Sequence, residues 1–229
     1  MRKNWLAWGL FAALFVVTWW HPIYPAEQSL HHSLTLVGIT FLIWLQRRGT
    51  LPPSSVALVL AFLALHTVAA RWIYSYVPYD DWLQALFGVR LSDLFGWHRN
   101  DFDRLVHLSY GLLLGPVLLA YFADRRHWRP GWAALAAVDI IISTGALYEL
   151  FEWGIAISLA PGAAEAYNGQ QGDLFDPQKD MAIAAIGAVI GVAVSLALRA
   201  RRRRSTVEPV ETVEIVETVE NAEAEVTVR

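Results

Sequence analysis

Apolar residues in this chain fall into six long runs, which short polar or charged segments separate. Each run approaches the roughly 17–25 residues that a helix needs to cross a bilayer, and the first two are at the short end. The first run follows Arg2 and Lys3 like a signal peptide, but Tyr24 spoils the small-residue pattern of a cleavage site ending at Ala26, which favours an uncleaved span. The pattern predicts six transmembrane helices, at about residues 5–20, 30–45, 56–74, 105–122, 132–159 and 181–198.

The polar segment between the third and fourth runs contains one further helical pattern. Residues 81–95 place Trp82, Leu86 and Leu94 at a boundary between polar and apolar faces, which predicts a short amphipathic helix on the membrane surface. Together with the six spans, this pattern predicts an all-α fold, a six-helix membrane bundle that occupies residues 1–204.

The composition supports a polytopic membrane protein. The chain has 229 residues, of which 55% are hydrophobic, 13% aromatic and only 17% charged, and its mean hydropathy is +0.36. These values are typical of membrane proteins, with aromatic side chains at the membrane–water interfaces, and not of soluble domains. Cysteine is absent from the sequence, which excludes disulfides, thiolate metal sites and cysteine nucleophiles.

The distribution of Lys and Arg predicts the orientation, because cytoplasmic segments carry an excess of these residues. If the N-terminus is cytoplasmic, the inside segments contain 12 basic residues and the outside segments and span ends contain 5. Both termini are therefore expected in the cytoplasm of a bacterial inner membrane, with the loops 75–102 and 160–180 outside. The inside set is Arg2, Lys3, Arg47, Arg48, Arg125, Arg126, Arg129, Arg199 and Arg201 to Arg204, and the outside set is Arg71, Arg90, Arg99, Arg104 and Lys179.

The tail, residues 205–229, differs from the rest of the chain. It contains seven Glu and one Arg and has no aromatic residue, whereas residues 1–204 have a net charge of +3. A segment with high like charge and few large apolar residues cannot bury enough surface to fold, so disorder is expected. A docking motif, or a screen for the basic cluster at 199–204, is the alternative.

Acidic residues and one histidine occur where the spans are expected to reach the outer surface. Asp103 and His107 are four positions apart, and Glu149 and Glu152 are three apart, so each pair shares a helix face. Asp180 opens the sixth span at the same level. A carboxylate in a lipid-facing helix costs about 2.5–3.5 kcal/mol even on a mild scale. The spacing therefore predicts that three spans bring these side chains into one sheltered site.

Carboxylates gathered in this way persist when a cation binds among them, when they share protons, or when arginines pair with them. Oxygen and imidazole ligands suit Mg, Mn, Zn or non-haem Fe, so a divalent metal ion is the expected cofactor. In an enzyme, a carboxylate or the histidine would act as general base. The predicted catalytic residues are His107, Glu149 and Glu152; the predicted metal ligands are Asp103, His107, Glu149, Glu152 and Asp180; the predicted supporting residues are Arg104, Gln171, Asp173 and Asp176.

Each of these groups also has a purely structural explanation. Glu149 and Glu152 would form a solvent-exposed face on a soluble helix, and Asp103 with His107 would form a hydrogen-bonded cap at the end of the fourth span. The acids before the sixth span would be explained by loop solvation and an N-cap, which Asp favours. His31 and His32 lie at the same outer level but are not expected to join the site.

Other motifs point to packing or exclude functions. Gly111 with Gly115, and Gly187 with Gly191, form small faces for close helix packing. The sequence has no phosphate-binding loop, no nucleophile elbow, no His-Glu-x-x-His and no dinucleotide fingerprint. The basic residues are the flanks expected of cytoplasmic loops, so no nucleic-acid partner is predicted.

Three segments carry a resemblance to a known family. They are NDFDRLVHLSYGLLLGP at 100–116, ALYELFEW at 146–153 and GQQGDLFDPQKDMAIAAIGAVIG at 169–191. In these segments the chain resembles a bacterial family of uncharacterised inner-membrane proteins typified by YjdF. The resemblance covers most of residues 5–198 and implies a membrane protein, but no activity.

The chain is also distantly similar to VanZ-like proteins, which carry Asp-Lys-x-x-His, Glu-x-x-Gln and Asp-x-x-x-Asn on three spans. Asp103 to His107 fits the first pattern with Arg104 in place of Lys, and Glu149 fits the second with Glu152 in place of Gln. The third begins at Asp180, where Ala184 stands in place of Asn. This likeness implies that the three segments contribute to one site, and loosely implies a role in the cell envelope.

The expected function is therefore that of an inner-membrane protein with an outward-facing Asp/His/Glu site that binds or modifies a lipid-linked or small envelope substrate. Two alternatives remain at this stage: a cation- or proton-coupled transporter, and a scaffold in which buried acid–arginine pairs only fix the helix register. The lipid bilayer is the one partner common to all three, and enzymatic activity stays undecided.

Overall fold

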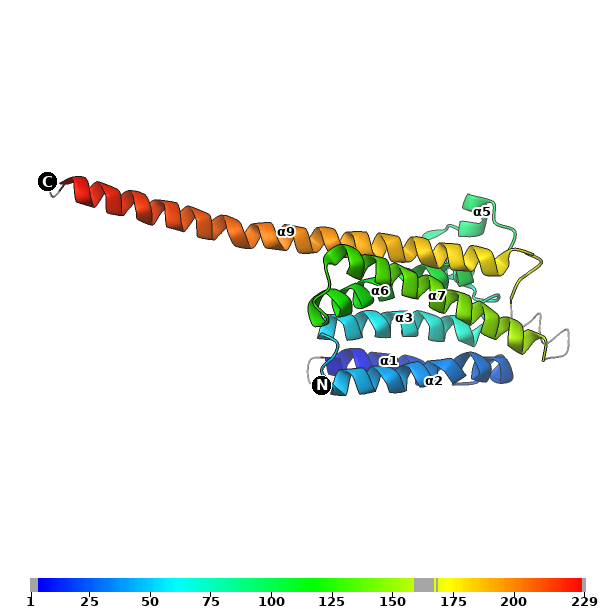
Figure 1. Cartoon of the computed structure of the whole chain (residues 1–229). Helices are drawn as coiled ribbons and strands as arrows, with labels where there is room; N and C mark the ends of the chain where they lie inside the picture. The colour runs from blue at the N-terminus through cyan, green and yellow to red at the C-terminus, as the bar shows by residue number, and fades with distance from the viewer. Residues whose placement is uncertain (1–3, 159–166, 168, 228–229) are drawn as a thin grey trace. The chain divides into compact units, whose positions relative to one another are not determined.

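The computed structural model describes residues 4–158, 167 and 169–227, and in these residues it contains helices and no strands (Figure 1). The predicted all-α class is therefore confirmed. In chain order the helices are α1 (Trp5–Thr18), α2 (Pro25–Arg47), α3 (Pro53–Arg71), α4 (Tyr79–Phe87), α5 (Leu91–Phe95), α6 (Phe102–Ala120), the π-helix η2 (Tyr121–Arg125), α7 (Pro130–Ala156) and α9 (Asp176–Thr227).

Four stretches of helix are long and apolar enough to cross a membrane. They are α3, α6 continued by η2, α7, and the Asp176–Arg204 part of α9. Helix α1 is apolar but has only 14 residues, and α2, with 23 residues, is not among the four. A multi-pass membrane protein is thus supported, while the six spans and the orientation of the termini stay predictions.

Several helix boundaries differ from the predicted ones; α2 and α9, for example, begin at Pro25 and Asp176, before the expected starts at 30 and 181. Helix α3 ends at Arg71, before Ile73 and Tyr74, which have positive φ angles of 40° and 60° that no helix continues. Helix α7 ends at Ala156, and the expected end at 159 lies outside the described residues. The amphipathic helix expected at 81–95 is wrong as a single element, because Gly88 adopts φ 69° and ends α4 before α5 begins.

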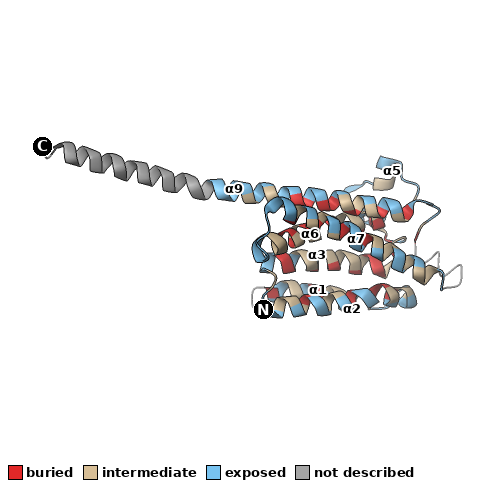
Figure 2. Ribbon diagram, viewed as in Figure 1, coloured by how far each residue is buried: buried red, intermediate tan, exposed pale blue. Residues whose placement is uncertain are grey.

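Residues 1–192 form one compact unit in which the long helices lie side by side (Figure 1). Helix α3 is central, since it packs against α1, α2 and α6, and α6 in turn packs against α7. Figure 2 shows the buried residues of this unit in red and the exposed residues in pale blue. The largest apolar group joins the first three helices through Phe11, Leu42, Val56, Leu60 and Leu63.

Helices α6 and α9 approach each other so closely that only glycine fits between them. A Cβ atom added at Gly111 would lie 1.9 Å from the carbonyl oxygen of Ala184, and one added at Gly187 would lie 2.2 Å from that of Leu108. Gly191 would meet the backbone of the other helix at 2.4 Å. The predicted role of these glycines in close packing is confirmed, and their contact sets the distance between the acids at the start of each helix.

The second unit begins at Ala193 and is described by itself. Helix α9 continues through it to Thr227, so the helix includes most of the tail for which disorder was expected. The disorder of residues 205–229 stays a prediction.

Candidate functional site

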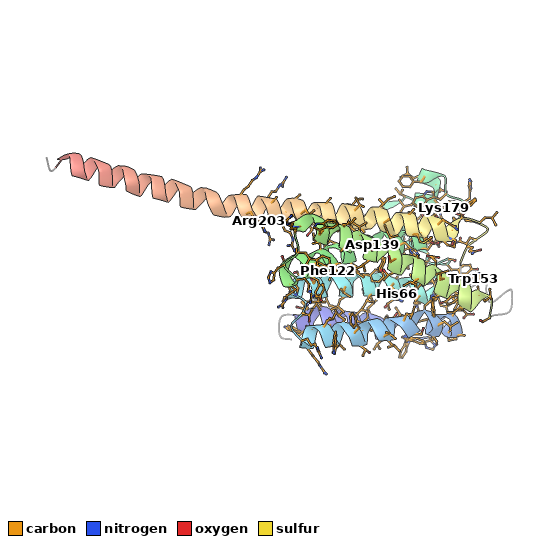
Figure 3. The ribbon with its side chains drawn as sticks, in the orientation of Figure 1. His66, Phe122, Asp139, Trp153, Lys179 and Arg203 are labelled. Carbon is orange, nitrogen blue, oxygen red and sulfur yellow. The ribbon has the colours of Figure 1, made fainter. Side chains whose placement is uncertain are left out.

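The residues predicted to form the site gather where α6 and α9 begin and where α7 ends. Figure 3 labels Lys179 near the start of α9 and Trp153 near the end of α7, at the same end of the helices. Because α6 and α9 run from this end and α7 runs toward it, acids that are far apart in sequence become neighbours. Asp103, Asp176 and Asp180 are all buried, at 8%, 4% and 5% exposure.

Arg104 occupies the centre of this acidic group. Its guanidinium donates hydrogen bonds to the carboxylates of Asp176 and Asp180, and to Asp173 Oδ2 at 3.2 Å. It also donates to the backbone carbonyl oxygen of Asp176 at 3.2 Å. The planar guanidinium can serve several oxygens at fixed angles, which a lysine cannot do. Arg104 therefore ties α6 to the first turns of α9.

Arg99 provides a second positive charge from the segment before α6, and it was not among the residues predicted for the site. It donates to the carboxylate of Asp103 and, at 2.5 Å, to Asp176 Oδ1, and it lies 3.5 Å from Asp101 Oδ1. In the scaffold alternative the acid–arginine pairs would include Asp103 with Arg104, but the Asp103 carboxylate pairs with Arg99 and accepts only the backbone N–H of Arg104, at 2.7 Å.

Two acids at the rim of the site lie outside the spans and show opposite pKa shifts. The hydrogen bond from Lys179, at 2.6 Å, and the backbone N–H of Phe175 hold the pKa of Asp173 below its ordinary value. Burial raises the pKa of Asp101, and the nearby charge of Arg99 opposes that rise. Lys179 and Arg99 thus compensate part of the negative charge at the rim.

His107, Glu149 and Asp180 form a second group, deeper than the arginine contacts. The Nε2 atom of His107 lies 4.0 Å from Glu149 Oε1 and 3.7 Å from Asp180 Oδ2, too far for hydrogen bonds. Glu149 Oε1 is buried without a hydrogen-bond partner among the described residues, and only 10% of its side chain is exposed. A buried carboxylate oxygen without a partner is costly, so a positive group bound beside it would be stabilising.

These three side chains fit a divalent cation. One ligand atom from each lies within 4.8 Å of the other two. Ligands held about 2.1 Å from a tetrahedral ion lie about 3.4 Å apart, so the observed 3.7 and 4.0 Å require only small movements. One oxygen each of Asp103, Asp176 and Asp180 also lie within 4.8 Å of one another. These carboxylates, however, already form ion pairs with Arg99 and Arg104. His107, Glu149 and Asp180 are therefore the better candidates.

Glu152 does not join this group, although the sequence predicted it as a ligand. It lies on the following turn of α7, where it interacts electrostatically with Tyr148, Tyr74 and Tyr167. Glu152 also interacts electrostatically with Glu149. Tyr148 lies four positions before Glu152 and so on the same helix face, whereas no spacing relates Tyr74 and Tyr167 to the acids.

Gln171 supports the site through the backbone and not through a ligand. Its amide nitrogen donates to the carbonyl oxygen of Asn100 at 3.0 Å, and its amide oxygen accepts the N–H of Asn100 at 2.9 Å. Gln171 adopts φ 50° between Gly169 and Gly172, which also have positive φ angles. This turn holds the segment before α9 against the segment before α6.

The remaining polar residues lie elsewhere. His31 and His32 pack near His66 of α3 and form no ion pair with a carboxylate in the described part of the chain, and their absence from the site stays a prediction. Asp139 is exposed on α7 (Figure 3). Arg71, a possible partner of the acids, instead donates to the carbonyl oxygen of Thr18 at 2.6 Å.

Comparison with known proteins identifies the family. The model of the predicted membrane protein family DUF2238 matches residues 3–202. The chain belongs to this family. The inner membrane protein YjdF of Escherichia coli (strain K12) is 27% identical to it over 192 residues, which cover 77% of this chain and 84% of that protein. No solved structure matches the chain.

The predicted resemblance to the YjdF family is therefore confirmed. The family description supports a membrane location but contains no activity. The likeness to VanZ-like proteins stays a prediction.

Proposed function

We propose that this chain is a six-span protein of the bacterial inner membrane, with both termini in the cytoplasm and an outward-facing site that binds a divalent cation. His107, Glu149 and Asp180 would hold the ion. The observation that carries this proposal is the buried, unpartnered oxygen of Glu149 that faces an imidazole and a second carboxylate. The inner-membrane location is supported by similarity to YjdF.

The arrangement of charges favours a cation over an anion. Arg99 and Arg104 are engaged by Asp103, Asp173, Asp176 and Asp180, so neither guanidinium is available to hold a phosphate in the described structure. Neither arginine donates a hydrogen bond to Glu149 Oε1 in the described structure. A cation that binds Glu149 would remove the cost of its unpaired charge.

In an enzyme, the bound ion would supply Lewis-acid polarisation of a carbonyl or phosphoryl oxygen. The side chains around it would position the substrate and move protons, with Glu152, which is not a ligand of the ion, as the general base. An ion site just beneath the outer surface of the membrane would be accessible to a lipid-linked or small envelope substrate. This chemistry rests on ion binding, which is the step to test first.

The test is equilibrium binding of Mn²⁺ and Zn²⁺ to the full-length protein in detergent. Wild-type protein is expected to bind one ion, and Glu149→Gln is expected to weaken binding by more than tenfold, because a ligand charge is lost while the shape is kept. Asp139→Asn is the matched control, since Asp139 is an exposed acid on the same helix. Equal binding by all three proteins, or none by wild type, contradicts the proposal.

A proton-coupled transporter is the second candidate, and one observation favours it. Polar side chains continue from Glu152 through Tyr148 and Tyr74 to His66, which bonds to Tyr74 through Nδ1. Such a series could pass protons between the carboxylates and α3. Proton flux into liposomes that carry a pH-sensitive dye, compared between wild type and Tyr74→Phe, tests it; equal flux to protein-free liposomes rejects it.

A further inference from the structure

A second group of titratable side chains lies between α2 and α3, outside the carboxylate site. His31 and His32 of α2 are 4% and 2% exposed, and the ring of His32 lies 5.9 Å from that of His66 of α3. Thr35 Oγ1 links the two helices, since it lies 2.6 Å from His66 Nε2 and 3.4 Å from His32 Nδ1. The hydroxyl of Tyr74 bonds to His66 Nδ1.

This histidine cluster, His31, His32 and His66, has no opposite charge beside it. Both ring nitrogens of His31 and Nε2 of His32 are buried without a hydrogen-bond partner among the described residues. No ion pair to any of the three rings is present in the described part of the chain. A proton on one of these rings would therefore add a buried charge that no ion pair compensates, which is unfavourable.

The groups that face the cluster come from each neighbouring element. Helix α1 contributes the uncharged rings of Phe15 and Trp19. Arg71, at the end of α3, is the one cation nearby, and it is turned toward the carbonyl oxygens that end α1. From the other side come the hydroxyl groups of Tyr74, Tyr148 and Tyr167 and the carboxyl group of Glu152, which interacts with these tyrosines.

The turn after α3 adds strain at the same place. Ile73 has φ 40° and is only 1% exposed, and Tyr74 has φ 60°. A left-handed conformation is unfavourable for both residues, and most of all for the β-branched Ile73. Contacts of Tyr74 with His31, at 4.9 Å between rings, and with His66 hold this turn in place. Loss of those contacts would allow the turn to relax.

The cluster also holds the segment that leads to the carboxylate site. Tyr167 is 3% exposed and stacks on His31 with ring centroids 4.7 Å apart and an angle of 11°. Burial raises the pKa of Tyr167, so the phenol stays neutral. Two residues later the carbonyl oxygen of Gly169 lies 3.5 Å from Ser75 Oγ, beside the strained turn.

The segment 169–176 then reaches the site through three described contacts. The carbonyl oxygen of Gln170 accepts from Arg99 at 3.3 Å, Gln171 bonds to Asn100, and Asp173 accepts from Arg104. A change at His31 therefore has a short physical route to the acids at the start of α9, through Tyr167 and this segment.

We infer that the histidine cluster and the turn at Ile73–Tyr74 form an acid-sensitive switch that releases Tyr167 and loosens the segment 169–176. At neutral pH the uncharged rings pack against the tyrosines and keep the turn strained. In acid, the state in which the rings reach water gains protons, and the turn relaxes. Control of cation binding by this switch rests on the proposed function, but the switch itself does not require an ion.

Amide hydrogen exchange of the full-length protein in detergent, without added metal, tests the switch. The readout is a peptide that covers 169–176, where Asp173 N–H bonds to the carbonyl oxygen of Gln170 at 2.9 Å. After correction for the intrinsic pH dependence, exchange in wild type is expected to rise roughly fivefold between pH 6.5 and 5.5, if one proton binds a histidine of ordinary pKa, about 6.5, in the open state. His31→Phe keeps a ring for stacking but cannot gain a proton, so its exchange is expected not to change with pH.

Two further variants make the result decisive. His98→Phe changes an exposed histidine before α6 and is expected to behave as wild type. Tyr167→Ala removes the stacked ring, so the segment is expected to exchange rapidly at pH 7.5 and to show no further rise in acid. The inference is overturned if wild-type exchange does not depend on pH, or if His31→Phe or Tyr167→Ala keeps the wild-type rise. Absence of metal binding would leave these outcomes unchanged, so the two proposals fail separately.

Discussion

Replacement of Gly111 by alanine places a methyl group onto the backbone of α9. The added Cβ would lie 1.9 Å from the carbonyl oxygen of Ala184 and 2.5 Å from the backbone nitrogen of Ala188. Real Cβ atoms essentially never approach closer than 3.0 Å, and a backbone neighbour cannot rotate away as a side chain does. The two helices must therefore separate by about 1 Å, which is expected to cost about 1–3 kcal/mol as other cases of overpacking do.

The same helices carry the acids of the site, so the separation has a second effect. His107 lies one turn before Gly111, and Asp180 lies one turn before Ala184. An increase of about 1 Å would take their 3.7 Å contact beyond the reach of one ion with ligands near 2.1 Å. Gly111→Ala is thus expected to weaken divalent-ion binding as well as stability.

A graded series of alanine variants controls for general effects of the substitution. The nearest atoms lie at 2.2 Å for Gly187, 2.4 Å for Gly191 and 3.3 Å for Gly115, whereas Gly145, buried in α7, has nothing within 4 Å. Loss of thermal stability, measured by tryptophan fluorescence in detergent, is expected to follow this order. Gly145→Ala is expected to be neutral or stabilising by up to about 1 kcal/mol, because alanine favours helix. Equal stability of Gly111→Ala and Gly145→Ala would refute the account of α6–α9 packing.

Three further outcomes are expected. Arg104→Gln removes the arginine partner of the buried Asp180 and is expected to destabilise the protein by about 3–5 kcal/mol in chemical denaturation. Arg90→Gln breaks a pair with 42% and 69% exposed side chains and is expected to leave the denaturation midpoint nearly unchanged. Lys179→Gln is expected to raise the depressed pKa of Asp173 in a carbon-13 NMR titration, and an unchanged pKa would contradict the role of Lys179. Any stability that this pair contributes is present above the unfolded pKa of about 3.9 and is lost as the pH falls through the lower folded pKa. A divalent ion at about 100 times its dissociation constant is expected to stabilise wild type by about 2.7 kcal/mol but not Glu149→Gln, and equal shifts in melting temperature would argue against this ligand.

The sequence predicted the convergence of the acids because helix periodicity and chain direction alone determine it. Asp103 and His107 share a face by their spacing, and the glycines of α6 and α9 indicate a close contact between those helices. What the spacing could not decide was how each acid is satisfied. Arg99 lies before α6 in an irregular segment, so its pairing with Asp103 depends on backbone geometry that no periodicity predicts.

For the fold too, the sequence predicted some features and missed others. Long apolar runs predicted helices at nearly the observed places, since burial of backbone polar groups in a membrane requires them. The end of α3 was missed because left-handed angles at Ile73 and Tyr74 are unfavourable for both residue types. Tertiary contacts with the histidine cluster hold this turn, and the sequence relates Tyr74 to His31 by no local pattern.

The central claim is that His107, Glu149 and Asp180 hold one divalent ion, and electron-nuclear double resonance of bound Mn²⁺ tests it most directly. An imidazole ligand gives a nitrogen-14 coupling that a site made only of carboxylates and water lacks. The account predicts this coupling in wild type and its loss in His107→Gln, with the control Asp139→Asn unchanged. Bound Mn²⁺ without a nitrogen coupling, or a coupling that survives in His107→Gln, would contradict the account.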